Sequence, residues 1–79
     1  MLKLSMPEEV EQYRQRCFNN VKEATDFENA EYWFKRALEC KSLLSLFYEK
    51  RMTWNDWARM KQIAELNREE REILKGATV

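Results

Sequence analysis

The apolar residues of this chain recur at spacings of three and four along three long segments, and this pattern predicts α-helices. In the first segment, one helix face carries Val10, Tyr13, Cys17, Val21 and Ala24. Before this stripe, Ser5 and Glu8 form a capping box, and Pro7 occupies the first turn, where its missing N–H costs nothing. The first predicted helix therefore spans residues 6–24.

The second segment is the most regular and the most apolar of the three. Its main stripe keeps a heptad spacing and comprises Ala30, Trp33, Ala37, Cys40, Leu44 and Phe47. Further apolar side chains lie on both flanks, so apolar surface covers well over half of the circumference. We therefore predict a helix over residues 28–51 that lies between the other two helices or at a seam between subunits. Its N-cap is either Thr25 with Glu28 or Asp26 with Asn29.

The third segment begins after another capping signature, in which Thr53 is followed by Asp56. Its apolar stripe comprises Trp57, Met60, Ile63 and Ala64. This stripe predicts a helix over residues 54–66, and a charged run then interrupts it, which we interpret as a solvent-exposed face with local ion pairs. Asn67 is a candidate cap for a short fourth helix over residues 68–75, and a straight continuation of the third helix is the alternative.

Together these elements predict a single all-α domain over residues 1–79. The expected architecture is a small three-helix bundle, an antiparallel helical hairpin plus a third helix, with the short fourth helix left open. The connection between the first two helices contains no Gly or Pro, which favours a short turn. Because one core of this size rarely supplies more than about 3–5 kcal/mol unaided, we expect support from a partner or a second copy.

The composition excludes most catalytic and cofactor chemistry. The chain has 79 residues, no His and a single Gly. Without His there is no His general base, no nucleophile activated by His and no His-ligated metal, and one Gly cannot build a phosphate-binding loop. Adjacent acidic residues such as Glu8 and Glu9 point in different directions on a helix and do not share a pocket. We therefore predict a non-enzymatic protein with no catalytic residue, cofactor or metal.

The two cysteines, Cys17 and Cys40, lack metal-ligand spacing. In an antiparallel hairpin they are predicted to lie too far apart for a disulfide, so we interpret both as buried thiols in a reducing cytoplasm. No apolar run approaches the about 20 residues that span a bilayer. The first nine residues have no apolar signal-peptide region either. We expect a cytoplasmic location and no membrane association.

The surplus of aromatic residues is the feature that points to function. Ten aromatic side chains, three of them Trp, exceed what the core of a small bundle needs. Interface anchors are enriched in Trp, Tyr and Arg. We assign Trp33, Phe47 and Trp57 to the core, because they lie on the main stripes. The residues predicted to form a protein interface are Phe34, Leu38, Leu43, Leu46, Tyr48, Trp54 and Ala58.

This candidate interface predicts a module whose partner is a protein. Self-association, most simply as a homodimer, is its first expected use. Docking on a larger protein as a small regulator or inhibitor is the second, and the two are compatible because a dimer can present a composite surface. Compact chains of this type are often encoded by phages or plasmids, and an anti-defence inhibitor is one function of that class.

The alternative function is that of a small nucleic-acid-binding transcriptional regulator. Basic residues such as Lys35, Arg36, Lys50 and Arg51 lie near aromatic residues that can stack on bases. Acidic residues are interleaved with them, however, and 14 basic against 14 acidic residues give a formal net charge of zero. Phosphate contacts dominate the affinity of such proteins, so this balance disfavours nucleic acid as the partner.

Overall fold

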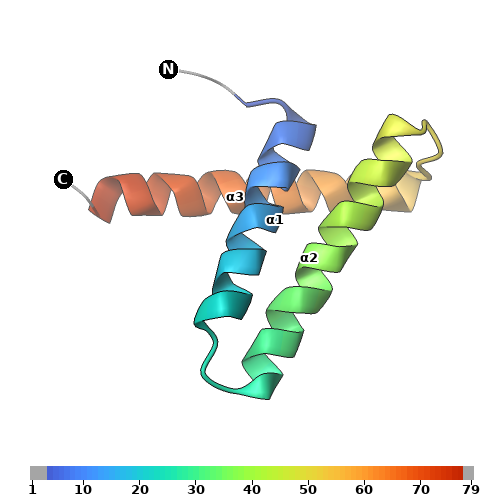
Figure 1. Ribbon diagram of the computed structural model, residues 1–79. Coiled ribbons are helices and arrows are strands. Elements are labelled where there is room, and N and C mark those ends of the chain that lie inside the picture. The colour runs from blue at the N-terminus through green and yellow to red at the C-terminus, as the bar shows by residue number, and fades with distance from the viewer. Residues whose placement is uncertain (1–3, 78–79) are drawn as a thin grey trace.

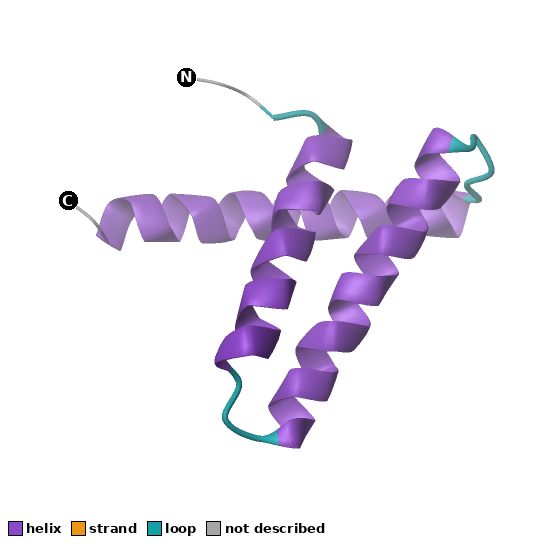
Figure 2. Ribbon diagram, in the orientation of Figure 1, coloured by secondary structure: helices purple, strands orange, loops and turns teal. Residues whose placement is uncertain are grey.

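The computed structural model describes residues 4–77 and contains three α-helices joined by short loops (Figures 1 and 2). Helix α1 spans Met6–Glu23, α2 spans Phe27–Tyr48 and α3 spans Trp54–Ala77. The described part of the chain has no strand. The predicted all-α class is therefore confirmed, as is the hairpin followed by a third helix.

Helices α1 and α2 lie side by side and antiparallel, and α3 crosses behind them (Figure 1). The molecule is consequently thin, with extents of 36 × 36 × 16 Å, close to the depth of two helix layers. Helix α1 contacts both other helices, whereas α2 meets α3 over only a few residues near the C-terminal end of α2. Of the two predicted positions for helix 28–51, the one between the other two helices is therefore wrong, because α1 holds it, and the one at a seam between subunits stays a prediction.

Side-chain caps determine where the helices begin. In the predicted capping box of α1, the Ser5 N–H donates to Glu8 Oε1 over 3.0 Å, and the Glu8 N–H donates to Ser5 Oγ over 3.4 Å. A second capping box precedes α3. The Thr53 N–H donates to Asp56 Oδ2 over 3.1 Å, and the Asp56 N–H donates to Thr53 Oγ1 over 3.2 Å. For α2, Asp26 is the N-cap, and its carboxylate accepts a backbone N–H of the first turn over 2.8 Å. This contact decides between the two predicted N-caps.

Helix α2 ends before the predicted position 51 because the chain turns left-handed at Lys50. The φ angle of Lys50 is 58°, which does not fit inside a right-handed helix. The Arg51 N–H donates to the Leu46 carbonyl over 2.9 Å, and the Lys50 N–H donates to the Phe47 carbonyl over 3.2 Å. These two bonds form a Schellman motif. Gly usually occupies the left-handed position, so a sequence with Lys there gives no stop signal.

Helix α3 is continuous, so the separate helices predicted over residues 54–66 and 68–75 are wrong, and the straight continuation is correct. Asn67, the candidate cap, lies inside the helix with a fully buried side chain. Its amide donates hydrogen bonds to side chains of α1. Because the amide is used in these tertiary contacts, it does not cap a new helix.

The core lies where α1 packs between α2 and the middle of α3. It contains apolar residues from all three helices, namely Val10, Tyr13, Cys17, Ala37, Cys40, Leu43, Leu44, Met60, Ile63 and Ala64. Trp33 and Phe47 are partly buried and pack against this cluster. Nearly all of these positions belong to the predicted apolar stripes, which confirms the helical periodicity of each segment.

Candidate protein-interaction surfaces

The seven residues predicted to form an interface do not share one surface. Leu43 is only 5 % exposed and belongs to the core, so its assignment to the interface is wrong. The reason is that Leu43 lies one turn after Glu39, whose carboxylate pairs with Arg59 of α3, so Leu43 is on the side of α2 that α3 meets. Leu46 is half-buried. The remaining five are exposed and fall into two groups, on α2 and at the start of α3: Phe34, Leu38, Tyr48, Trp54 and Ala58.

The first surface, which we call the aromatic corner, is formed by Met52, Trp54 and Trp57 where α2 joins α3. The two indole rings meet edge to face, with 6.0 Å between centroids and an interplanar angle of 86°. Together with Thr53, the corner lines a hollow of about 700 Å³. Lys61 Nζ lies 5.4 Å from the centroid of the Trp57 ring, in a cation–π contact. An apolar hollow with this much exposed indole is typical of a binding surface.

The aromatic corner is not part of the core, because both of its indole side chains are exposed. Trp54 is 84 % exposed and Trp57 is 40 % exposed, so the prediction that Trp57 belongs to the core is wrong. The first turn of α3 extends past the outer edge of α2 (Figure 1) and has no helix to pack against there. An apolar stripe gives the direction of a side chain around its own helix, but not whether a neighbouring helix reaches it.

Basic groups surround the aromatic corner. Lys50 and Arg51 are exposed in the loop that leads into it, and Lys61 lies on α3 one turn beyond. The acidic groups nearby are engaged, since Asp56 accepts the backbone N–H that caps α3 and Glu49 lies 3.8 Å from Arg51. Lys50, Arg51 and Lys61 against Glu49 and Asp56 therefore leave a local net charge of +1 next to the corner, although the whole chain is neutral.

The second surface, the hairpin front stripe, runs along α2 on the side away from α3. It consists of Phe27, Phe34, Leu38 and Tyr48, which are all exposed. Glu39 marks the side toward α3, because its carboxylate pairs with Arg59 over 2.9 Å. At about 100° per residue, Phe34 lies about 140° around the helix from Glu39. Phe34 meets Phe18 of α1 edge to face at 6.5 Å, but no helix within residues 4–77 covers the stripe.

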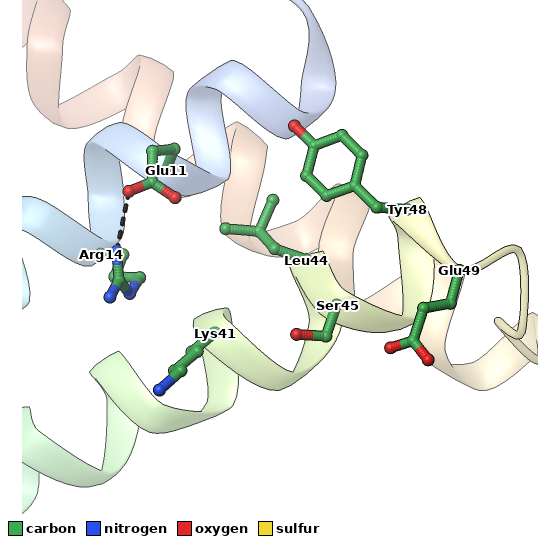
Figure 3. A pocket seen from close by; sticks show the side chains of 7 residues that line it. All are labelled: Glu11, Arg14, Lys41, Leu44, Ser45, Tyr48 and Glu49. Atoms are coloured by element: carbon green, nitrogen blue, oxygen red, sulfur yellow. Dashed lines mark hydrogen bonds and ion pairs between the residues drawn. The ribbon is translucent and has the colours of Figure 1, made fainter.

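Near the C-terminal end of the stripe, α1 and α2 border a hollow of about 390 Å³ (Figure 3). Its walls are formed by Glu11, Arg14, Lys41, Leu44, Ser45, Tyr48 and Glu49. Glu11 and Arg14 of α1 form an ion pair of 2.8 Å, whereas Lys41 of α2 has no ion-pair partner within the described residues. Leu44 points between the two helices (Figure 3) and provides an apolar floor.

Between α1 and α3 lies a buried cluster of polar side chains, which we call the polar junction. Asn67 Nδ2 donates to Glu9 Oε1 and to Gln12 Oε1, both over 2.9 Å. Arg71 forms an ion pair with the same Glu9 carboxylate. The Asn67 Oδ1 atom has no hydrogen-bond partner among residues 4–77. The polar junction fixes where α3 crosses α1, because any sliding of the helices leaves these buried groups unpaired.

The charged run after Asn67 is more than a solvent-exposed face, which corrects its interpretation from the sequence. Glu70 pairs with Arg16 of α1 over 2.8 Å, and Arg71 pairs with Glu9. Both contacts join residues more than fifty positions apart. Hydrophobic periodicity identifies only the apolar face of a helix. It therefore gives no indication that the polar side chains of the polar junction contact one another.

The two cysteine side chains are buried, free and unreactive, which agrees with their interpretation as buried thiols. Burial raises the pKa of Cys17 to about 11 and the pKa of Cys40 to about 12. The thiolate is the reactive form, so neither residue is a nucleophile at neutral pH. Burial also raises the pKa of Tyr13, although Arg36 donates a hydrogen bond of 2.6 Å to its hydroxyl. These groups therefore serve the core.

Within residues 4–77, no group of three or more Cys, Asp and Glu side chains is arranged to hold a metal ion. No helix in the described chain combines the length and the apolar character needed to cross a bilayer. A scan against family models, and searches of curated proteins and of solved structures, find no match. The function is therefore argued from the aromatic corner and the hairpin front stripe.

Proposed function

We propose that this chain is a non-enzymatic protein-binding module, which docks on a larger protein through its aromatic corner and acts as a small regulator or inhibitor. The observation that carries the proposal is the 84 % exposure of Trp54 beside a hollow of about 700 Å³. Trp is among the residues most enriched at interface hot spots. An exposed indole next to a hollow offers both a side chain to insert and a place to receive one.

Burial of Trp54 supplies a large part of the binding energy in this proposal. An aromatic side chain buries about 150–250 Å², so covering Trp54 contributes about 3–5 kcal/mol before the costs of association. The Trp54 and Trp57 rings meet edge to face, and this contact favours one orientation of the Trp54 ring in the proposed free state. Less side-chain entropy is then lost on binding.

The charge of the rim indicates the chemistry of the partner. Lys50 and Arg51 directly precede the residues that line the apolar hollow, and Lys61 lies over the Trp57 ring, so a complementary partner presents an apolar side chain flanked by acidic residues. Complementary charge at the rim speeds association and selects among partners more than it adds affinity. We therefore expect the partner to be a protein with an acidic surface around one apolar anchor.

The test compares the wild-type chain with Trp54→Ala and with Ile73→Ala, a matched control that removes an exposed apolar side chain at the far end of the same helix. Each chain is used as bait in extracts of the source cells, and captured proteins are purified for affinity measurements. Truncation of a hot-spot residue costs about 2 kcal/mol or more, so we expect Trp54→Ala to weaken binding at least about 30-fold. Ile73→Ala is expected to change it by less than about threefold.

Circular dichroism establishes that each variant is folded. A purified partner that binds Trp54→Ala as tightly as the wild type overturns the proposal. Binding to duplex DNA or RNA that falls steeply with salt, and that Trp54→Ala does not weaken, supports the nucleic-acid alternative in its place.

A further inference from the structure

We propose that a second copy of this chain covers the hairpin front stripe, with the two α2 helices packed antiparallel about a two-fold axis near position 36. The proposal goes beyond the docking role of the aromatic corner and does not rest on it. Helix α3 crosses one face of the hairpin, away from the turn that joins α1 and α2, and the dimer covers the opposite face (Figure 1). The resulting order of layers is α3, hairpin, hairpin and α3 of the partner.

The stripe is part of a second regular seam on α2. Alternating steps of four and three residues, the spacing of a coiled-coil seam, connect Phe27, Glu31, Phe34, Leu38, Lys41, Ser45 and Tyr48. All members of this seam are exposed in the protomer. The other seam of α2 runs from Ala30 to Phe47 and packs against α1. A helix with two such seams is built to be contacted on both, and no helix of the described chain covers the seam from Phe27 to Tyr48.

The residues of the open seam are complementary to themselves. In an antiparallel pair, facing positions mirror each other about the two-fold axis. With the axis near position 36, Phe34 faces Leu38 of the partner subunit, and symmetry repeats this contact. Glu31 then faces Lys41 of the partner subunit, also twice. Within the protomer, Glu31 has only an exposed contact of 3.7 Å with Lys35.

Neighbouring registers lack this complementarity. A shift by one heptad in one direction places Phe34 opposite Glu31 of the partner subunit. A shift in the other direction places Leu38 opposite the partner's Lys41. Either shift buries a charged group against an apolar side chain, which is unfavourable. The register about position 36 is therefore the one in which apolar groups meet and opposite charges meet.

The same register fills the hollow between α1 and α2. Phe27 of the partner subunit faces Ser45 and therefore lies over the hollow shown in Figure 3. The volume of the hollow, about 390 Å³, exceeds the about 150 Å³ of a cavity that accepts a benzene ring. Leu44 supplies the apolar floor and Tyr48 an aromatic wall, and the remaining walls are Ser45 and the charged Glu11, Arg14, Lys41 and Glu49. Because the hollow is open, these charged ends can stay in water while the ring of Phe27 contacts Leu44. Phe27, which is 76 % exposed in the protomer, becomes buried in the dimer.

The size of the uncovered face lies at the lower end of the range for a stable interface. Helix α2 has 22 residues and is about 33 Å long, and two helices side by side are about 20 Å wide. The front of the hairpin thus offers about 650 Å² in projection, compared with about 800 Å² per partner in a standard interface. The protomer is also more open than a compact domain, with a radius of gyration of 13.4 Å against about 11.6 Å expected for its length. A net charge of zero adds no long-range repulsion between copies.

Sedimentation velocity between about 1 and 200 µM tests the dimer, because this range brackets the micromolar affinities of small interfaces. We expect the wild type to approach twice the chain mass of 9.7 kDa. Lys41→Glu places like charges against each other twice and is expected to weaken dimerisation about tenfold or more. Combining it with Glu31→Lys in one chain restores both pairs and returns the affinity to within about threefold of the wild type. Leu38→Glu is expected to abolish the dimer, and Ile73→Glu, outside the seam, is the matched control.

Circular dichroism at the lowest concentration establishes folding. If Leu38→Glu fails to fold, the Lys41→Glu variant and the double variant with Glu31→Lys still test the register, because both positions are exposed in the protomer. A wild-type chain that stays monomeric over the whole range overturns the dimer. If the chain dimerises but Lys41→Glu, alone or together with Glu31→Lys, leaves the dimer affinity unchanged, the proposal that this seam forms the interface is wrong. No heterologous protein is present, so failure here leaves the proposal for Trp54 unaffected.

Discussion

Asn67 anchors the crossing of α3 over α1, and its replacement by Ala is expected to destabilise the fold. Its side-chain amide supplies hydrogen bonds of 2.9 Å to both Glu9 and Gln12. Asn67→Ala leaves the Glu9 carboxylate, which is almost fully buried, with Arg71 as its remaining partner at the polar junction. A buried acceptor that loses its donor costs about 1–3 kcal/mol.

Two effects reduce this cost. The Asn67 Oδ1 atom has no hydrogen-bond partner within the described chain, so its removal is favourable. Ala also has a higher helix propensity than Asn, by up to about 0.7 kcal/mol. We therefore expect a net loss of about 1–2 kcal/mol in the free energy of unfolding. For a domain of this size, that loss lowers Tm by about 4–16 °C.

Urea unfolding followed by circular dichroism measures this loss, at one low protein concentration so that association does not contribute. Asn19→Ala is the control, because Asn19 is an exposed Asn inside α1 and makes the same change in helix propensity. We expect Asn19→Ala to be neutral or slightly stabilising. The reasoning is refuted if the two variants differ by less than about 0.5 kcal/mol.

The remaining predictions concern a thiol and an ion pair. The pKa of Cys40 is about 12 in the fold against 9.0 ordinarily, because of burial. The unfolded chain therefore loses this proton first, and Cys40 alone is expected to lower the free energy of unfolding by on the order of 1–2 kcal/mol as pH rises from about 9 to 10.5. Cys17, whose pKa is about 11, adds a separate fall over the same range, so the wild type is expected to lose more stability than Cys40→Ala. Urea unfolding across this range checks it, and an equal fall in Cys40→Ala contradicts it. Arg59 and Glu39 are 32 % and 39 % exposed, so a double-mutant cycle with Ala is expected to give a coupling below about 1 kcal/mol that shrinks with salt. A salt-independent coupling above about 2 kcal/mol contradicts this screening argument.

The local structure of this protein is predictable because it depends on residues that are close in the sequence. Ser5 with Glu8, and Thr53 with Asp56, cap their helices as the sequence indicates. The apolar stripes likewise identify most of the core. The end of α2 at Lys50 could not be predicted. Gly is the residue that usually marks a left-handed helix end in a sequence, and here the left-handed residue is Lys.

The tertiary arrangement is only partly predictable, because periodicity gives angles around one helix and not the position of its neighbours. Leu43 and Phe34 lie on opposite flanks of the α2 stripe, and the sequence pattern alone predicts that both are exposed apolar residues outside the core. Helix α3 covers the flank with Leu43 and leaves the flank with Phe34 exposed. Which flank α3 covers depends on polar groups such as Glu9 and Asn67, and the pattern of hydrophobic residues contains no information about these groups.

The central position of α1 has a consequence for the order of folding. Contacts within the hairpin connect nearby parts of the chain, whereas the hydrogen bond between Asn67 and Glu9 joins residues 58 positions apart. Closing so long a loop loses chain entropy before any contact compensates for it. We therefore expect the hairpin to assemble as a local unit and α3 to dock on it afterwards. In the native ensemble α3 is the first segment to open, and its amide hydrogens exchange with solvent while the hairpin is still closed.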